Sequence, residues 1–345
     1  MGLSTFPGAC VRTLIALLFF SVTTSTTIAQ QTHLLVVVGL GGAPVYTERF
    51  HAWAIALTDA VIERYSVPAD NIIYLGEKTD INKKVIADRS TKENIVVAIN
   101  TIIDRSAPSD HVAIVLFGHG SFTDTARINL PGRDLSAADF VELLDQLHGR
   151  RIIFVNTASA SGPFIQALSG EGRIVVTATK TGGERNATIF GGYFVKAFTE
   201  GEEEADQNKD RRVSILEAFN YARLRVEAEY EAAGKLLTEH ALLDDDGDGE
   251  GTDAPDPLAG DGMFARTVFF TGAKDIAIAE MAFPDDPELR GLYEERIALE
   301  EQVEELRLLR NGIDSERYAE ELEDILIELA LKSREIRQLE EVKEN

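Results

Sequence analysis

Short apolar runs separated by helical segments constrain the fold of this 345-residue chain more than any other feature. The runs begin near residues 33, 71, 111, 151 and 173, and they lack the alternation of a strand with one solvated face. Segments with helical spacing lie between them, at 46–65, 91–106 and 139–147. Strands that alternate with helices form βαβ units, so the sequence predicts a three-layer α/β/α fold with a mainly parallel sheet.

The first thirty residues predict export. Arg12 precedes the apolar stretch 13–22, and a Ser/Thr-rich segment then leads to Ala29. These are the parts of a secretory signal peptide, and the stretch is shorter than the roughly 20 apolar residues that a spanning helix needs. We therefore expect residues 1–29 to be removed, leaving a secreted or periplasmic protein with no membrane span.

Cys10 is the only cysteine in the chain, and it lies within the predicted signal peptide. A mature chain without thiols has no disulfide, no thiolate metal site and no cysteine nucleophile.

The acidic composition excludes one class of partner. The formal net charge is −24, whereas binding nucleic acid through its phosphates needs clustered Lys and Arg. The glycine-rich turn GLGGAP at 39–44 lacks the full GxGxxG spacing of a dinucleotide site. We therefore expect neither a nucleic-acid partner nor an organic cofactor.

Reactive side chains follow two of the predicted strands. The third strand ends Phe117-Gly118-His119-Gly120-Ser121, and the fourth ends in the segment NTASASG at 156–162. Because parallel strands deliver these loops to one edge of the sheet, His119 is predicted to face Ser159 or, alternatively, Ser161. The flanking Gly120 lets the loop bend and leaves the imidazole accessible. This is the arrangement of a base beside a nucleophile.

These two motifs resemble those of the caspase-like cysteine peptidases, particularly the legumain-like branch, over roughly residues 33–270. That family carries His-Gly after one strand and Ala-Cys-x-Ser-Gly after the next; here the motifs are His119-Gly120 and Ala158-Ser159-Ala160-Ser161-Gly162. The resemblance implies a caspase-like fold, a peptide or protein ligand in the cleft, and Ser159 at the position of the catalytic cysteine.

The serine leaves the function open. A hydroxyl is a far weaker acid than a thiol, so it needs a base oriented by a third group, for which Asp124 or Asp134 would have to be recruited. No GxSxG elbow of a serine hydrolase is present. One hypothesis is a degenerate peptidase homologue that acts as a binding or scaffold module. The alternative is an active hydrolase that uses Ser159 with His119 as general base.

Glu184 and Arg185 follow the fifth strand, where the resemblance places part of the substrate pocket. They are candidates for contacting a substrate side chain, and the alternative is that they are ordinary loop charges.

Acidic spacing predicts calcium binding. The loop 206–217 has the ligand pattern of an EF-hand, although Arg211 replaces the usual glycine at position 6 and should weaken binding. The alternative is an acidic loop in which Ser214 caps the next helix. A second, incomplete loop has Pro255 at position 12. The predicted ligands are Asp206, Asn208, Asp210, the Arg212 carbonyl, Ser214 and Glu217 in the first loop, and more weakly Asp244, Asp246 and Asp248 in the second. A Ca²⁺-dependent structural or assembly protein is thus a third functional hypothesis.

The composition changes after about residue 280, where Glu, Leu and Arg dominate. Two near-heptad apolar series flank the turn signal Asn311-Gly312. We predict an α/β domain at 30–283, with the calcium-loop insertion at about 204–256, and an antiparallel helical hairpin or coiled coil at 284–345. The hairpin is expected either to fold against its own domain or to bind a helical partner or a second copy.

Overall fold

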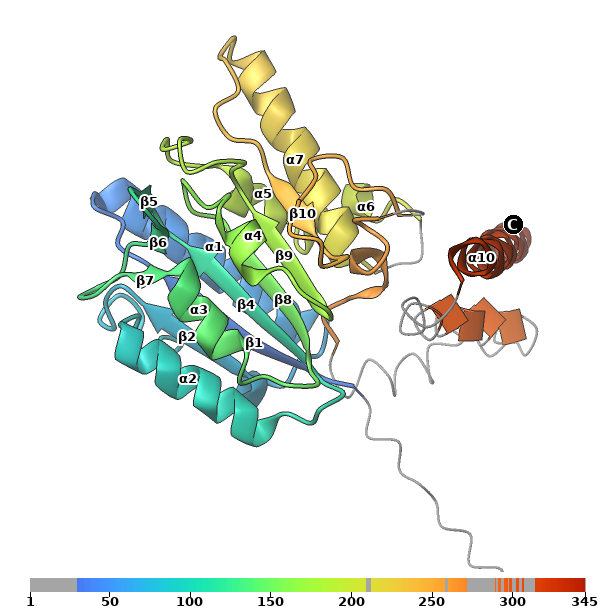
Figure 1. The fold of residues 1–345 in the computed structure, drawn as a ribbon, viewed down its shortest axis with the longest axis horizontal. Coiled ribbons are helices and arrows are strands. Elements are labelled where there is room, and N and C mark those ends of the chain that lie inside the picture. Colours follow the sequence, from blue (N-terminus) through green and yellow to red (C-terminus); the bar gives the residue numbers. More distant parts are fainter. Residues whose placement is uncertain are drawn as a thin grey trace, which may run out of the picture.

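A computed structural model describes residues 30–208, 212–257, 260–271, part of the segment 289–306, and 314–344. Its centre is a seven-stranded sheet in the order β10-β9-β8-β4-β1-β2-β3 (Figure 1). Neighbouring strands are parallel except at the edge, where β10 runs antiparallel to β9. The strands are β1 (Thr32–Val38), β2 (Ile72–Gly76), β3 (Asp88–Arg89), β4 (His111–Phe117), β8 (Arg151–Asn156), β9 (Arg173–Thr177) and β10 (Leu242–Asp244).

Every residue of β1 and β4 is buried, because helices cover both faces of the sheet. Leu34 and Val36 face one apolar cluster, and Leu35 and Val37 face the other. The first cluster contains residues of α1 (Pro44–Glu63), α5 (Phe190–Ala197) and α7 (Ile215–Ala232); the second contains residues of α2 (Lys92–Arg105), α3 (Ala137–Leu144) and α4 (Phe164–Leu168). The predicted three-layer α/β/α fold with a mainly parallel sheet is confirmed.

A small antiparallel sheet follows β4 and was not predicted. It consists of β5 (Gly120–Phe122), β6 (Ala126–Ile128) and β7 (Leu135–Ser136). Strands of two or three residues are too short to produce a periodic pattern in a sequence. Asn129 connects this sheet to its surroundings, since its amide donates to the His119 carbonyl and its own carbonyl accepts from the Leu40 amide.

The remaining short elements are the 3₁₀ turns η1 (Ala69–Asn71) and η2 (Ala265–Thr267) and the helix α6 (Glu202–Ala205). Across the described residues, no helix combines the length and apolar character that crossing a bilayer requires. The predicted signal peptide lies outside the described residues.

The C-terminal part of the chain contains α10 (Ser315–Glu344), which pairs with helical residues in the segment 289–306. Leu322 packs with Val303 and Leu306, and Lys332 forms an ion pair of 2.6 Å with Glu295. Leu322, near the start of α10, thus contacts the end of the segment 289–306, and Lys332, further along α10, contacts an earlier residue of that segment. The segment and α10 therefore run antiparallel. Their apolar contact also includes Met263, which precedes the last residues of the α/β domain.

Candidate active site

Strands β4 and β8 bring the two predicted motifs together at the carboxyl edge of the sheet. The strands pair in parallel, with Leu116 opposite Asn156, and their loops leave in the same direction. Beyond them, the Gly120 amide donates to Ser159 Oγ at 3.2 Å, and Ser159 Oγ lies 3.3 Å from the Gly120 carbonyl oxygen, to which it donates. The serine hydroxyl is therefore held by the backbone of the residue that follows His119.

The loop that carries Ser159 is buried and strained. Ser159 is 2% exposed, and the next residue, Ala160, has a φ of +53° in the left-handed region. An L-residue with a Cβ in that region costs about 1–3 kcal/mol, and such strain is concentrated at functional sites. The Ala160 amide donates to the Glu184 carbonyl at 2.8 Å, which helps to hold the strained conformation.

Two backbone segments approach each other so closely at position 120 that only glycine fits there. A Cβ at this position would lie 2.2 Å from the Ser159 carbonyl oxygen and 3.0 Å from the Arg127 carbonyl oxygen. Sequence reasoning attributed this glycine to a sharp bend and an accessible imidazole. The structure gives a steric reason instead, because no side chain fits between the His119 loop and the Ser159 loop.

His119 is half-buried in an aromatic setting. Its ring meets Tyr46 edge-on at a centroid distance of 4.7 Å and Phe50 at 5.2 Å. Burial lowers the pKa of His119, and the Arg49 charge lowers it further, while a hydrogen bond with the Gly41 backbone raises it. The net effect favours the neutral imidazole. Gly41 was missed from sequence because only folding brings the turn after β1 to the end of β4.

The two carboxylates considered as a third catalytic group do not act on His119. Asp134 accepts from the Leu130 amide at 2.9 Å, and Asp124 is exposed in the turn between β5 and β6. The charged side chain that shifts the pKa of His119 is Arg49, a cation.

Ser161, the alternative nucleophile, is bonded to the loop after β9. Its Oγ lies 3.0 Å from Thr179 Oγ1 and accepts from the Thr179 amide at 3.2 Å. Thr179 Oγ1 in turn accepts from the amides of Ser161 and Gly162. Ser161 is 1% exposed, so this hydroxyl serves a buried link between two loops, and the contact with Gly120 belongs to Ser159.

Glu184 and Arg185, the predicted pocket residues, both have partners within the chain. Glu184 accepts from the Lys180 amide, and its other oxygen lies 2.6 Å from His240 Nδ1. The exposed Arg185 donates to the Phe122 carbonyl at 3.1 Å. Contact of either residue with a substrate stays a prediction.

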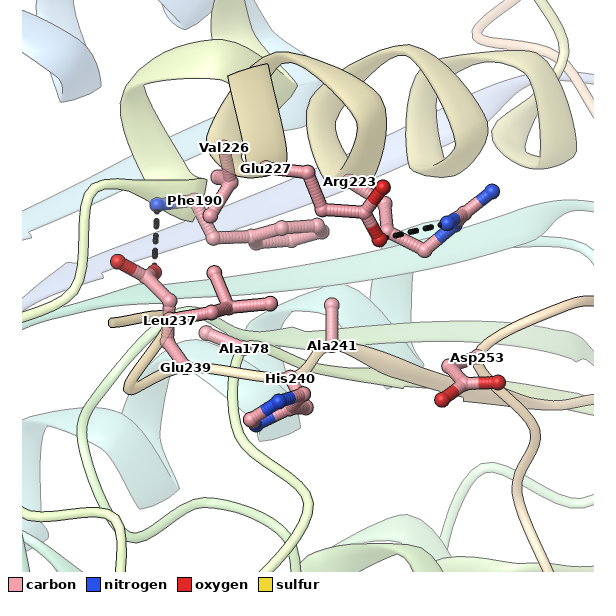
Figure 2. Close-up of a pocket in the computed structure, with 10 residues that line it drawn as sticks. All are labelled: Ala178, Phe190, Arg223, Val226, Glu227, Leu237, Glu239, His240, Ala241 and Asp253. Atoms are coloured by element: carbon pink, nitrogen blue, oxygen red, sulfur yellow. Dashed lines mark hydrogen bonds and ion pairs between the residues drawn. The ribbon is translucent and has the colours of Figure 1, made fainter. Parts of the chain in front are cut away.

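A pocket lies between α7 and the segment that leads into β10 (Figure 2). Its lining includes His240, the residue bonded to Glu184. The volume of this pocket is about 300 Å³, including the space at its open mouth. Glu239 is 3% exposed there and accepts from the amides of Ile189 and Phe190, and burial raises its pKa. The lining residues are Ala178, Phe190, Arg223, Val226, Glu227, Leu237, Glu239, His240, Ala241 and Asp253.

The first predicted calcium loop ends in a capping box. One Glu217 oxygen accepts from the amides of Gln207 and Asn208, and the other accepts from the Ser214 amide and hydroxyl. Ser214 Oγ accepts from the Glu217 amide, so it caps α7. Of the other predicted ligands, Asp206 is buried and Asp210 lies outside the described residues. The contacts of Ser214 and Glu217 match the capping alternative.

Asp244 and Asp246, from the second predicted loop, come together with Asp261. One carboxylate oxygen from each lies within 4.8 Å of the others. Burial, together with neighbouring carboxylates, raises the pKa of Asp244 to about 6 and that of Asp261 to about 7. Asp248 is not part of this cluster and accepts from the Glu250 amide. Asp261 was missed because it lies beyond the loop pattern in sequence.

A comparison with protein-family models agrees with the motifs. Residues 60–242, slightly more than half of the chain, match the model of the Peptidase C13 family. Similar solved structures include caspase-1 from Spodoptera frugiperda, at 8% identity, with a TM-score of 0.40, covering 63% of this chain and 86% of that one. Another is protein GSU0716 from Geobacter sulfurreducens, at 11% identity, with a TM-score of 0.42, covering 70% of this chain and 98% of that one. No curated protein matches the sequence. The chain belongs to the Peptidase C13 family.

Proposed function

We propose that this chain is a noncatalytic Peptidase C13 homologue that binds a peptide or protein segment at the carboxyl edge of its sheet. The observation that carries the proposal is the position of the Ser159 hydroxyl, which is bonded to the amide and carbonyl of Gly120. A hydroxyl that donates to a backbone carbonyl is not donating to a base. The site then serves as a shaped surface without a nucleophile.

The electrostatics around His119 support the same conclusion. A serine nucleophile transfers its proton to the histidine, so the imidazolium that forms must be stabilised, usually by a carboxylate. Here the neighbouring charge is Arg49, which disfavours imidazolium. Serine lacks the readily ionised thiol that would make such a carboxylate dispensable.

An active hydrolase that uses Ser159 with His119 as base is the second candidate. Two observations favour it. The strained Ala160 follows Ser159 directly, and His119 is kept in the neutral form that a general base needs.

A Ca²⁺-dependent structural role is the third candidate. The close approach of Asp244, Asp246 and Asp261 supports it, because hard oxygen ligands at this spacing suit Ca²⁺.

Export of the chain is also a proposal, and it rests on the pattern of residues 1–29. A helical partner of residues 284–345 rests on the two apolar series in that segment.

Restoring the thiol tests the noncatalytic proposal. The purified chain is assayed on a fluorogenic peptide library and with a fluorophosphonate probe that labels activated serines. We expect the parent to be inert, Ser159→Cys to gain cleavage, and Ser159→Cys with His119→Ala to lose it. Ser161→Cys is the matched control and should gain nothing, because that side chain faces Thr179.

Labelling of the parent by the phosphonate, abolished by His119→Ala, would contradict the proposal in favour of the active hydrolase. If Ser159→Cys stays inert although its melting temperature equals that of the parent, the assignment of this edge as a former peptidase centre fails.

A further inference from the structure

The turn between β1 and α1 provides the backbone group that contacts His119. The hydrogen bond with the Gly41 backbone raises the pKa of His119. Only an acceptor stabilises the protonated ring, so the group that faces His119 is the Gly41 carbonyl. Together with the Tyr46 and Phe50 rings, that carbonyl therefore holds the imidazole beside the Ser159 loop.

A buried carboxylate from the neighbouring strand holds this turn. Glu77 directly follows β2 and is 9% exposed. Its Oε2 accepts from the Gly41 amide at 3.2 Å and from Thr47 Oγ1 at 2.9 Å. Glu77 thus joins the turn to the first part of α1 through one oxygen atom.

The turn fits tightly against α1. A Cβ on Gly41 would lie 2.3 Å from Thr47 Oγ1 and 2.5 Å from the Thr47 amide nitrogen. The Thr47 amide also donates to the Ala43 carbonyl at 3.1 Å. Such a contact tolerates little displacement, because a shift in either direction produces an overlap or breaks a bond to a charged acceptor.

We propose that Glu77 is a positioning residue: its carboxylate fixes the Gly41 turn so that the Gly41 carbonyl holds the His119 ring at the Ser159 loop. The inference rests on the proposed function only in treating His119 as part of a former peptidase centre. Glu77 itself touches no reacting group. It acts through its hydrogen bonds to Gly41 and Thr47 and through the backbone of a single residue, Gly41.

A merely structural role for Glu77 makes a different prediction. If Glu77 only stabilises the fold, its removal lowers the melting temperature and leaves the titration of His119 unchanged. If it positions Gly41, its removal weakens the bond from His119 to the carbonyl and lowers the pKa of His119. The titration of one ring therefore separates the two roles.

The experiment compares Glu77→Ala, Glu77→Gln and Glu48→Ala, each in the parent and in the Ser159→Cys background. Gln retains an oxygen that accepts from both Gly41 and Thr47, so it should restore the parent behaviour. Glu48 is exposed on α1 and serves as the matched control. The chain has six histidines, so His119 is assigned in ¹³C-labelled protein by loss of its signal in His119→Ala.

We expect Glu77→Ala to lower the pKa of His119 in the parent, and to lower kcat in the Ser159→Cys background by about 10- to 100-fold with KM changed less than about threefold. Glu77→Gln and Glu48→Ala should match their backgrounds in both measurements. Should Glu77→Ala fail to fold, Thr47→Val removes one of the two donors to the carboxylate and should lower the same pKa by less.

The proposal is overturned if Glu77→Ala and Glu48→Ala give the same pKa of His119. Where Thr47→Val has to replace Glu77→Ala, the same comparison is made with Thr47→Val. The titration in the parent does not depend on cleavage. If Ser159→Cys proves inert, the proposed function fails, while a lowered pKa of His119 in Glu77→Ala that Glu77→Gln restores still supports the positioning role.

Discussion

Ser159 Oγ lies 3.2 Å from the Gly120 amide nitrogen and 3.3 Å from the Gly120 carbonyl oxygen, so the two motifs of this chain are bonded to each other through one hydroxyl. A thiol at the same position would make weaker and longer hydrogen bonds to both groups. The serine therefore adds a link between the loops at the position that the proposed function assigns to a lost nucleophile.

The tight approach at Gly120 makes a substitution there costly. Gly120→Ala places a Cβ 2.2 Å from the Ser159 carbonyl oxygen, which forces the two loops apart. We expect the free energy of unfolding to fall by about 2 kcal/mol, within the usual range for overpacking. Urea denaturation measures this change. Gly183→Ala is the control, since its Cβ would meet Thr181 Oγ1 at an ordinary 3.4 Å; an equal loss in both variants would contradict the steric argument.

The hydrogen bond between Ser161 and Thr179 should give a measurable interaction energy in a double-mutant cycle of unfolding free energies. Thr179→Val leaves the buried amides of Ser161 and Gly162 without their acceptor and should cost about 1–3 kcal/mol of unfolding free energy. Ser161→Ala should cost less, because it leaves one buried amide, that of Thr179, without its acceptor instead of two. In the double variant the two losses should fail to add by at least about 0.5 kcal/mol. Additive losses would show that the two side chains act independently.

The raised pKa values of Asp244 and Asp261 predict how stability depends on pH. Both carboxyls hold protons in the folded chain up to about pH 6 and 7, whereas they release them near pH 3.8 when unfolded. The folded state thus binds more protons between these limits, so this cluster lowers the free energy of unfolding as pH rises from about 4 to 7.

Asp261→Asn tests that dependence. The amide keeps an oxygen that accepts from the Asp245 backbone and carries no charge. We expect it to raise the free energy of unfolding by about 1 kcal/mol at pH 8 and to change it little at pH 4. The exposed Asp253→Asn is the control. A gain of equal size at both pH values would mean that the charge of the buried Asp261 carboxylate is not the cause.

Calcium binding is tested by thermal melts in Ca²⁺ and in chelator. If the cluster holds Ca²⁺, saturation at about 100 times Kd adds roughly 2.7 kcal/mol of stability. The resulting rise in melting temperature should be lost in Asp246→Asn and kept in Asp206→Asn. The opposite result would assign the ion to the loop 206–217. If the melting temperature of the parent does not rise in Ca²⁺, the calcium-binding hypothesis is contradicted.

Much of the fold was predictable because burial on both faces leaves a clear pattern. Runs such as residues 112–117 of β4 are apolar throughout only when helices cover the sheet on both sides, and the sheet has that arrangement. The likeness to the legumain-like peptidases also came from local sequence, since His119-Gly120 and Ala158–Gly162 are each contiguous, and the family match confirms it. Which of Ser159 and Ser161 contacts the His119 loop did not follow from sequence, because both lie in the same short segment.

The sequence by itself determined the five longer strands of the sheet, the helices at 46–65, 91–106 and 139–147, and the two motifs at the strand ends, because each depends on the spacing of neighbouring residues. Only the tertiary structure decided the bonds around those motifs: Ser159 to Gly120, Ser161 to Thr179, and Glu77 to the Gly41 turn. These bonds join residues of segments that follow different strands of the sheet. Their partners are selected by the register and packing of the sheet, and a linear pattern carries no record of which distant groups meet.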